Sequence, residues 1–174
     1  VQGNRGCYWG KCAFCVHIAG VHGRKGARVK RRPYENLIRD FEHLVKTYAP
    51  RFVSLADVSI APPVMRKICD ALIQKGLKVP WLVFLRFDKG FDRELLELMR
   101  QAGCFILHFG MESGSDHVLR AMRKGHDLTV ARRILDDATE LGFRITLHTM
   151  AGLPGETRED LAKTIRLGKE DAPR

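Results

Sequence analysis

The sequence predicts an α/β fold in which a parallel sheet is wound into a partial barrel. Short apolar segments alternate along the chain with segments whose apolar residues recur at helical spacing, which is typical of parallel strands joined by crossover helices. Several predicted strands end in polar, glycine-containing loops, where an α/β barrel carries its chemistry. We count about five strand–helix units in the 174 residues, too few for a closed eight-fold barrel.

Local signals place the individual elements. A first strand is expected at residues 1–3, where it is cut short, and a helix follows from Pro33 to Pro50 because proline suits a first turn and stops a helix interior. Further strands are expected at residues 52–56, 81–87, 105–109 and 144–150. Further helices are expected at residues 62–76, 92–103, 116–122 and 128–141, and a last one after Thr157, which has capping-box spacing to Asp160.

Composition limits the class of protein. The chain, residues 1–174, has enough apolar residues (45%) for one core, and because it begins with Val1 we expect it to be a fragment of a longer protein with truncated flanks. No apolar run approaches the roughly 20 residues that a membrane helix needs. Three of the five cysteines share one loop, which indicates a metal site in a reducing, cytoplasmic compartment. Cys69 and Cys104 are expected to be small buried residues.

The net charge of +10 concentrates in a basic stretch formed by Arg24, Lys25, Arg28, Lys30, Arg31 and Arg32. Such a stretch can bind nucleic acid or an anionic substrate. We favour a solvated loop because no aromatic residues interleave to stack on bases. The same charges could steer an acidic substrate or an acidic electron donor.

The cysteine loop contains Cys7, Cys12 and Cys15 in a C-x4-C-x2-C spacing, with Gly6 and Gly10 allowing sharp turns. Thiolates favour zinc or iron–sulfur clusters. With His17 as a fourth ligand, the loop would make a closed Cys3His zinc site. Without it, three cysteines would hold a four-iron cluster with one iron open. The spacing alone leaves both alternatives open.

Three stretches, in order along the chain, resemble the radical S-adenosylmethionine (SAM) superfamily: the cysteine loop, Gly110–Ser115 with Leu119 to Gly125 behind it, and Gly152–Thr157. The resemblance implies a partial (β/α)6-type TIM barrel holding a [4Fe–4S] cluster. SAM would chelate the open iron, and an electron from a reductant such as flavodoxin or ferredoxin would cleave SAM to a 5′-deoxyadenosyl radical. The zinc site becomes the minor alternative.

The resemblance also implies which residues contact SAM. Phe14 would pack near the adenine, and Glu112 would accept hydrogen bonds from the ribose. The alternatives are a loop anchor for Phe14 and a helix cap for Glu112. The other implied contacts are Ser113 at the ribose, Met150, Gly152 and Leu153 along the adenine, Arg86 at the SAM carboxylate, and Lys124 as a weaker candidate there.

Two departures from the family pattern refine the prediction. Four residues, rather than three, separate Cys7 from Cys12, as in subgroups that carry an N-terminal cobalamin-binding domain, including peptide-modifying methylases. The resemblance therefore favours cobalamin-dependent methylation of an unactivated carbon in a small molecule or peptide, with cobalamin on a domain that is not present here. The family's Gly-Gly-Glu is absent, and Asp57 and Ser59 stand where the SAM amino group would bind.

His108 and His148 fall on predicted strands whose alternation could point them into the barrel. A histidine on a strand is usually a satisfied core residue, and we favour that interpretation. His108 shares parity with Glu112 and is the better candidate for a substrate-facing acid or base. Two rival functions remain: a methylthiotransferase-like enzyme acting on RNA, which the basic stretch motivates, and a non-catalytic Cys3His zinc-binding module.

Overall fold

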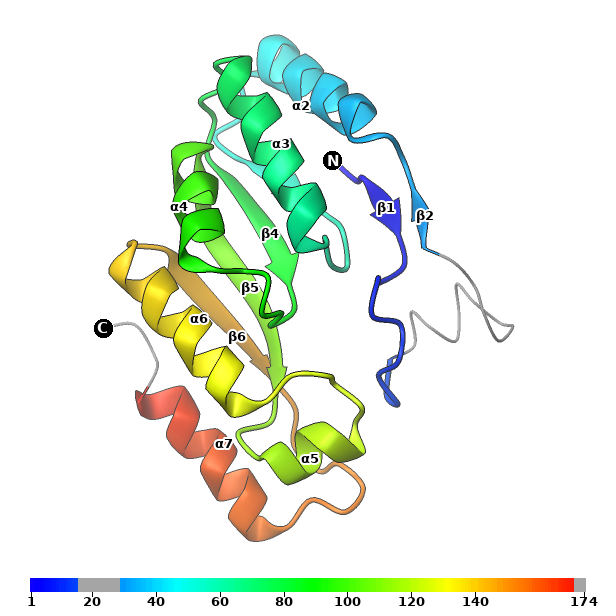
Figure 1. Cartoon of the computed structure of the whole chain (residues 1–174), viewed down its shortest axis with the longest axis vertical. Helices are drawn as coiled ribbons and strands as arrows, with labels where there is room; N and C mark the ends of the chain where they lie inside the picture. Colours follow the sequence, from blue (N-terminus) through cyan, green and yellow to red (C-terminus); the bar gives the residue numbers. More distant parts are fainter. Residues whose placement is uncertain (16–28, 171–174) are drawn as a thin grey trace.

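A four-stranded parallel sheet forms the centre of the computed structural model, which describes residues 1–15 and 29–170. Its strands are β3 (Val53–Leu55), β4 (Trp81–Leu85), β5 (Cys104–Glu112) and β6 (Arg144–Thr149), and they lie side by side in chain order. A helix follows each strand, so the described chain forms one part of a barrel wall (Figure 1). This confirms the predicted α/β class and the partial barrel.

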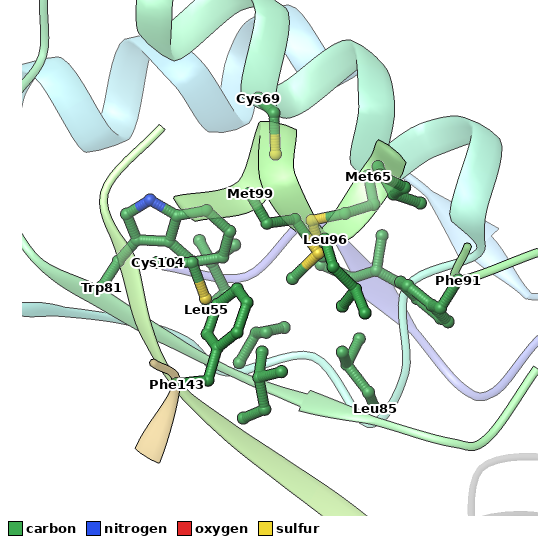
Figure 2. Close-up of a cluster of buried hydrophobic side chains, with 14 of the residues drawn as sticks. Leu55, Met65, Cys69, Trp81, Leu85, Phe91, Leu96, Met99, Cys104 and Phe143 are labelled. Atoms are coloured by element: carbon green, nitrogen blue, oxygen red, sulfur yellow. The ribbon is translucent and has the colours of Figure 1, made fainter. Parts of the chain in front are cut away.

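Four helices, α2 (Tyr34–Tyr48), α3 (Pro62–Gln74), α4 (Arg93–Gln101) and α6 (Leu128–Glu140), pack in a row along one side of the sheet (Figure 1). Between them and the sheet lies the hydrophobic core, part of which is drawn in Figure 2. Cys69 and Cys104 are fully buried in it, as predicted, and the indole nitrogen of Trp81 donates to the Ala102 carbonyl at 2.7 Å. The short α5 (Asp116–Ala121) and α7 (Arg158–Glu170) lie at the carboxyl end of the sheet.

The helix boundaries lie where local signals predict them. Pro62 is the first residue of α3, and the Asp92 carboxylate accepts from the Leu95 amide at 2.8 Å to cap α4. At α7, the Thr157 hydroxyl accepts from the Asp160 amide while the Asp160 carboxylate accepts from the Thr157 amide, at 3.2 and 3.1 Å. These contacts confirm the predicted capping box.

Several strand predictions need correction. β4 ends at Leu85, two residues before its predicted end, and β6 ends at Thr149, one residue before its predicted end. β5 continues to Glu112, three residues beyond the predicted end, because its last residues still pair with β6. β3 is shorter than predicted, and Phe52, just before it, is 51% exposed. Residues 1–3 do not form a regular strand. The Val1 ammonium nevertheless donates to the Ser54 carbonyl at 2.7 Å, and the Val1 carbonyl accepts from the Ala56 amide at 2.8 Å, so Val1 runs beside β3.

A small antiparallel sheet, which the sequence did not predict, joins β1 (Asn4–Arg5) to β2 (Lys30–Arg31). Two-residue strands are too short to show a period in the sequence, so no local signal marks them. Among the described residues, no helix combines the length and the apolar character needed to cross a membrane.

Candidate functional site

The cysteine loop, residues 6–15, is held at the carboxyl end of the sheet. Gly6 and Gly10 have φ of +95° and +61°, the left-handed conformation that their lack of a side chain permits. The Tyr8 hydroxyl donates to the carboxylate of Asp88, which follows β4, at 2.9 Å, and burial raises the pKa of Tyr8. The Ala13 amide donates to the Met122 carbonyl after α5 at 2.8 Å. The loop therefore spans from the end of β4 to the end of α5.

Arg86, directly after β4, is 6% exposed and braces this loop. Its guanidinium lies over the Trp9 ring, 4.5 Å from the centroid, and 5.6 Å from that of Tyr8. It donates to the Lys124 carbonyl at 2.6 Å and to Asp88 at 3.4 Å. Arg86, the predicted SAM-carboxylate residue, thus lies against the cysteine loop, with Nη1 and Nη2 each bonded to the protein.

The turn between α5 and α6 supports the cysteine loop through contacts with Trp9. The Trp9 indole nitrogen donates to the Arg123 carbonyl at 2.9 Å. Gly125 has φ of +78°, and a Cβ atom there would lie 2.0 Å from the Trp9 ring. The ring therefore rests directly on the glycine backbone. Sequence reasoning used Gly125 only as a motif landmark and missed this contact, because the two residues are far apart in the chain.

The three loop cysteines are unpaired thiols of intermediate exposure. Burial raises the pKa of Cys12, and the nearby charges of Lys124 and Arg86 act in the opposite direction. Among the described residues, no three Cys, His, Asp or Glu side chains gather closely enough to hold a single ion. Thiols are the ligands that iron–sulfur clusters take, and the Lys124 and Arg86 cations near Cys12 would balance the negative charge of a cluster. The chemistry of the loop therefore fits such a cluster.

His17, the fourth ligand of the zinc alternative, lies outside the described residues, as do Arg24, Lys25 and Arg28 of the basic stretch. The remaining basic residues, Lys30, Arg31 and Arg32, lie on and after β2, and all three are exposed.

Glu112 ends β5 with φ of +65°, a strained conformation for a residue with a side chain. Its Oε1 lies 2.7 Å from the Lys124 ammonium, and the two residues are 8% and 7% exposed. A Cβ on Gly110 would come within 2.6 Å of Oε1 and 2.8 Å of the ammonium, so the pair lies over that glycine. The ammonium is 5.7 Å from the Phe14 ring centroid, which links the pair to the cysteine loop.

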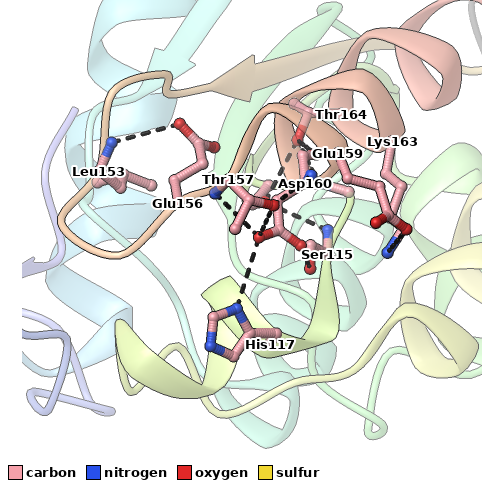
Figure 3. Close-up of polar contacts among 11 residues, drawn as sticks. Ser115, His117, Leu153, Glu156, Thr157, Glu159, Asp160, Lys163 and Thr164 are labelled. Carbon is pink, nitrogen blue, oxygen red and sulfur yellow. Dashed lines mark hydrogen bonds and ion pairs between the residues drawn. The ribbon is translucent and has the colours of Figure 1, made fainter.

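The loop after β6 meets the same site through its backbone. The Met150 amide donates to the Glu112 carbonyl at 2.8 Å. The Gly152 and Leu153 amides donate to the Glu156 carboxylate at 2.6 and 3.3 Å; Figure 3 shows the Leu153 contact. Met150 is therefore placed beside Glu112, and the turn that follows is fixed by its own glutamate.

Ser113 lies instead beneath α7. It is fully buried, and its hydroxyl is 3.2 Å from the hydroxyl of Thr164. Asp160 ties the same loop to α7 by accepting from Ser115 at 2.6 Å, and Figure 3 shows this carboxylate between Ser115, Thr157 and His117. These hydrogen bonds hold the pKa of Asp160 well below its usual range.

Asp57 and Ser59 follow β3 and face the N-terminal segment. The Asp57 carboxylate accepts from the amides of Gly3 and Asn4, at 3.0 and 2.5 Å, and burial raises its pKa. The Ser59 hydroxyl is buried without a hydrogen-bond partner among the described residues. Both residues line a cavity of about 210 Å³. Asp57 thus has its oxygens engaged by backbone, whereas the Ser59 hydroxyl is unengaged.

On the face of the sheet opposite the helices, three rings from neighbouring strands lie together. Phe84 stacks on His108 with centroids 4.6 Å apart, and His108 Nδ1 is 3.3 Å from His148 Nε2. Partial burial and the neighbouring His148 lower the pKa of His108. His148 is exposed and His108 is half-buried. The interpretation of both as core histidines is therefore incorrect.

His126, which sequence reasoning missed, follows Gly125 in the turn between α5 and α6. Both ring nitrogens are buried and lack a hydrogen-bond partner among the described residues. The ring meets Phe87 edge-on, with centroids 5.2 Å apart. Burial, together with the charges of Lys124 and Arg86, lowers its pKa to about 3. The imidazole is therefore neutral at physiological pH.

Comparison with known proteins identifies relatives of this chain. An uncharacterized methyltransferase from Pyrococcus horikoshii is 28% identical over 98% of this chain and 36% of its own length. A tRNA-2-methylthio-N(6)-dimethylallyladenosine synthase from Mycolicibacterium paratuberculosis is 30% identical over 88% of this chain and 32% of its own. The chain therefore spans about a third of the length of these curated relatives.

Solved structures share the fold. TsrM from Kitasatospora setae, a radical SAM methyltransferase, superposes with a TM-score of 0.85 at 17% identity, over 98% of this chain and 33% of its own. Methylornithine synthase superposes with a TM-score of 0.71 at 17% identity, over 99% and 50%. The family model of the radical SAM superfamily matches residues 1–168. With the cysteine loop seated beside the Glu112 end of β5, this match shows that the chain belongs to the radical SAM superfamily.

Proposed function

We propose that this chain is the catalytic core of a radical SAM enzyme in which Cys7, Cys12 and Cys15 hold the [4Fe–4S] cluster. The superfamily uses this cluster and SAM. When bound, they supply an electron transfer and a 5′-deoxyadenosyl radical. The observation that carries the proposal is the contact between the cysteine loop and the turn after α5: the Ala13 amide donates to the Met122 carbonyl, and the Phe14 ring meets the Lys124 ammonium that pairs with Glu112.

The chain's own side chains would bind and orient SAM around this point. Glu112 would accept from the ribose hydroxyls, and Phe14 would pack on the adenine. Arg86 stays a candidate for the SAM carboxylate, although its present bonds favour a bracing role. Of the two candidates for the SAM amino group, the unengaged Ser59 hydroxyl is better placed than Asp57. Met150, Gly152 and Leu153 would lie along the adenine. Ser113 stays a candidate for the ribose, although its contact with Thr164 beneath α7 favours a structural role.

The finer proposal is cobalamin-dependent methylation of a small molecule or peptide. Its support is the four-residue interval between Cys7 and Cys12, together with the methyltransferase relative from Pyrococcus horikoshii. Cobalamin would be held by another part of a longer protein. An acidic flavodoxin or ferredoxin would supply the electron, and the free thiols suit the reducing cytoplasm.

A second candidate is a methylthiotransferase-like activity on RNA. Relatives that act on tRNA match 88% of the chain at 30% identity, and exposed Lys30, Arg31 and Arg32 could contact phosphates. These relatives are about three times longer than this chain, so an RNA-binding part would lie elsewhere.

For the acid or base, we propose His108 assisted by His148. The rings share a hydrogen bond at 3.3 Å on the open face of β5 and β6, two residues before Gly110, over which the Glu112 carboxylate lies. A lowered pKa keeps His108 neutral near pH 7, as a proton acceptor requires.

The test is anaerobic reconstitution with iron and sulfide, followed by SAM, a strong reductant and an assay for 5′-deoxyadenosine. We expect wild-type protein to form product and the triple variant Cys7→Ala, Cys12→Ala, Cys15→Ala to form none. Cys69→Ala, which removes a core thiol, is the matched control and should keep product formation. S-adenosylhomocysteine as the main product would favour methyl transfer. Tight zinc without acid-labile sulfide would contradict the enzyme and support the zinc module.

A further inference from the structure

We infer that Lys124 is a positioning residue that holds Glu112 for the SAM ribose, and that it is not a contact of the SAM carboxylate. The inference rests on the proposed function, because it concerns how this chain binds SAM. Its first support is the engagement of the ammonium, which lies 2.7 Å from Glu112 Oε1 and 5.7 Å from the Phe14 ring centroid.

The carboxylate has a clear need for this partner. Glu112 is 8% exposed, and a buried charge without a partner either takes up a proton or rearranges. Its backbone is already in a strained conformation at φ of +65°, which directs the side chain back over Gly110. Lys124 therefore fixes the carboxylate at the end of β5 through the 2.7 Å contact with Oε1.

The geometry also leaves a place for the ligand. Only Oε1 is bonded to Lys124, and among the described residues Oε2 accepts no hydrogen bond. A ribose diol offers two hydroxyl donors, and an ionised carboxylate can accept both. A carboxylate that loses its lysine is no longer held in this orientation, so the ribose would bind more weakly.

Lys124 itself is fixed from two sides. Arg86 donates to its backbone carbonyl at 2.6 Å, and the Phe14 ring faces its ammonium. Because the Lys124 side chain is 8% exposed, its ammonium has little freedom to turn toward a methionine carboxylate without breaking the Glu112 contact. Such a break would leave Glu112 unpaired, and this cost opposes a direct role at the SAM carboxylate.

Two ligands separate the two roles. SAM carries both a ribose and a methionine carboxylate, whereas 5′-methylthioadenosine carries the ribose without the carboxylate. Binding of each would be measured anaerobically on the cluster-loaded protein for wild type, Lys124→Met, Lys124→Arg, Glu112→Gln and the double variant Glu112→Gln with Lys124→Met. The exposed Lys78→Met serves as the matched control, and iron content and circular dichroism report loading and folding.

We expect Lys124→Met to weaken both ligands by the same factor, roughly tenfold, as for a lost hydrogen bond to a charged group. The loss should shrink in the Glu112→Gln background, and Lys124→Arg should restore part of the affinity. SAM weakened with 5′-methylthioadenosine unchanged would overturn the inference in favour of a carboxylate contact, as would additive losses in the double variant. If Lys124→Met fails to load, Lys124→Arg with Glu112→Gln carries the same comparison.

Different results would contradict the proposed function and the inference about Lys124. If cluster-loaded wild type binds neither ligand, the SAM site itself is contradicted. If it binds SAM but not 5′-methylthioadenosine, the SAM site stands and the ribose role of the Glu112–Lys124 pair is overturned.

Discussion

At the scale of single residues, the site depends on how closely Trp9 approaches Gly125. A Cβ atom at residue 125 would lie 2.0 Å from the indole, and the φ of +78° there is strained for any other residue. Gly125→Ala should therefore displace the ring and loosen the cysteine loop. We expect the iron and acid-labile sulfide bound after reconstitution to fall by at least half, measured per folded chain.

Gly142 provides the control for backbone strain. Its φ is +73°, but nothing lies within 4 Å of an added Cβ. Gly142→Ala should cost about 1 kcal/mol in the free energy of unfolding and leave iron content unchanged. Equal iron loss in the two variants would show that the Trp9 contact does not hold the loop.

His126 predicts a pH dependence of stability. Its pKa is lowered from 6.5 to about 3 in the folded chain, so the unfolded chain binds the proton first as pH falls. The free energy of unfolding should therefore decrease below pH 6.5, by about 2 kcal/mol between pH 7 and pH 5 from this group. Denaturant titrations at both values should show a smaller difference in His126→Phe. An identical difference in the variant would refute the assignment.

At the scale of elements, α7 is tied to the loop after β5 by its first turn. The Thr157 hydroxyl accepts from the Asp160 amide, and Asp160 in turn accepts from Ser115. Thr157→Ala should cost about 1 kcal/mol in the free energy of unfolding. It should also speed amide hydrogen exchange in the first turn of α7. Thr129→Ala, an exposed threonine in the first turn of α6, should leave both measurements nearly unchanged.

The elements also show what a sequence can predict. Pro62, Asp92 and Thr157 act on backbone groups within a few residues, so they mark helix starts without knowledge of the fold. The pairing of β1 with β2, and the stacking of Arg86 on Trp9, join segments far apart in the chain and leave no local pattern.

In the candidate site, too, the sequence predicts local motifs but not the contacts between distant segments. The cysteines and the order of the motifs predicted the family, which the family model confirms. The individual SAM contacts stay predictions. The ion pair of Glu112 with Lys124 could not be foreseen, because its geometry depends on Gly110 and on a turn that only the folded chain brings near.

At the scale of the whole molecule, the net charge of +10 should govern the encounter with an electron donor. An acidic donor protein is attracted to a basic partner, and salt screens that attraction. The rate of cluster reduction by an acidic flavodoxin should therefore fall at least tenfold between low and high ionic strength. Stopped-flow spectroscopy would measure it, with an uncharged small reductant as the control. A rate independent of salt would exclude electrostatic steering.

The contact of Trp9 with the turn between α5 and α6 also sets an order of events during biosynthesis. The indole bonds the carbonyl of a residue 114 positions later in the chain. At ordinary rates of translation, the ribosome needs about 6 to 23 seconds to make that length. The thiols of the cysteine loop are therefore exposed to solvent until the turn between α5 and α6 has been synthesised. Delivery of iron and sulfide should therefore follow the synthesis of α5. At low oxygen concentration, the thiols would escape oxidation during this interval.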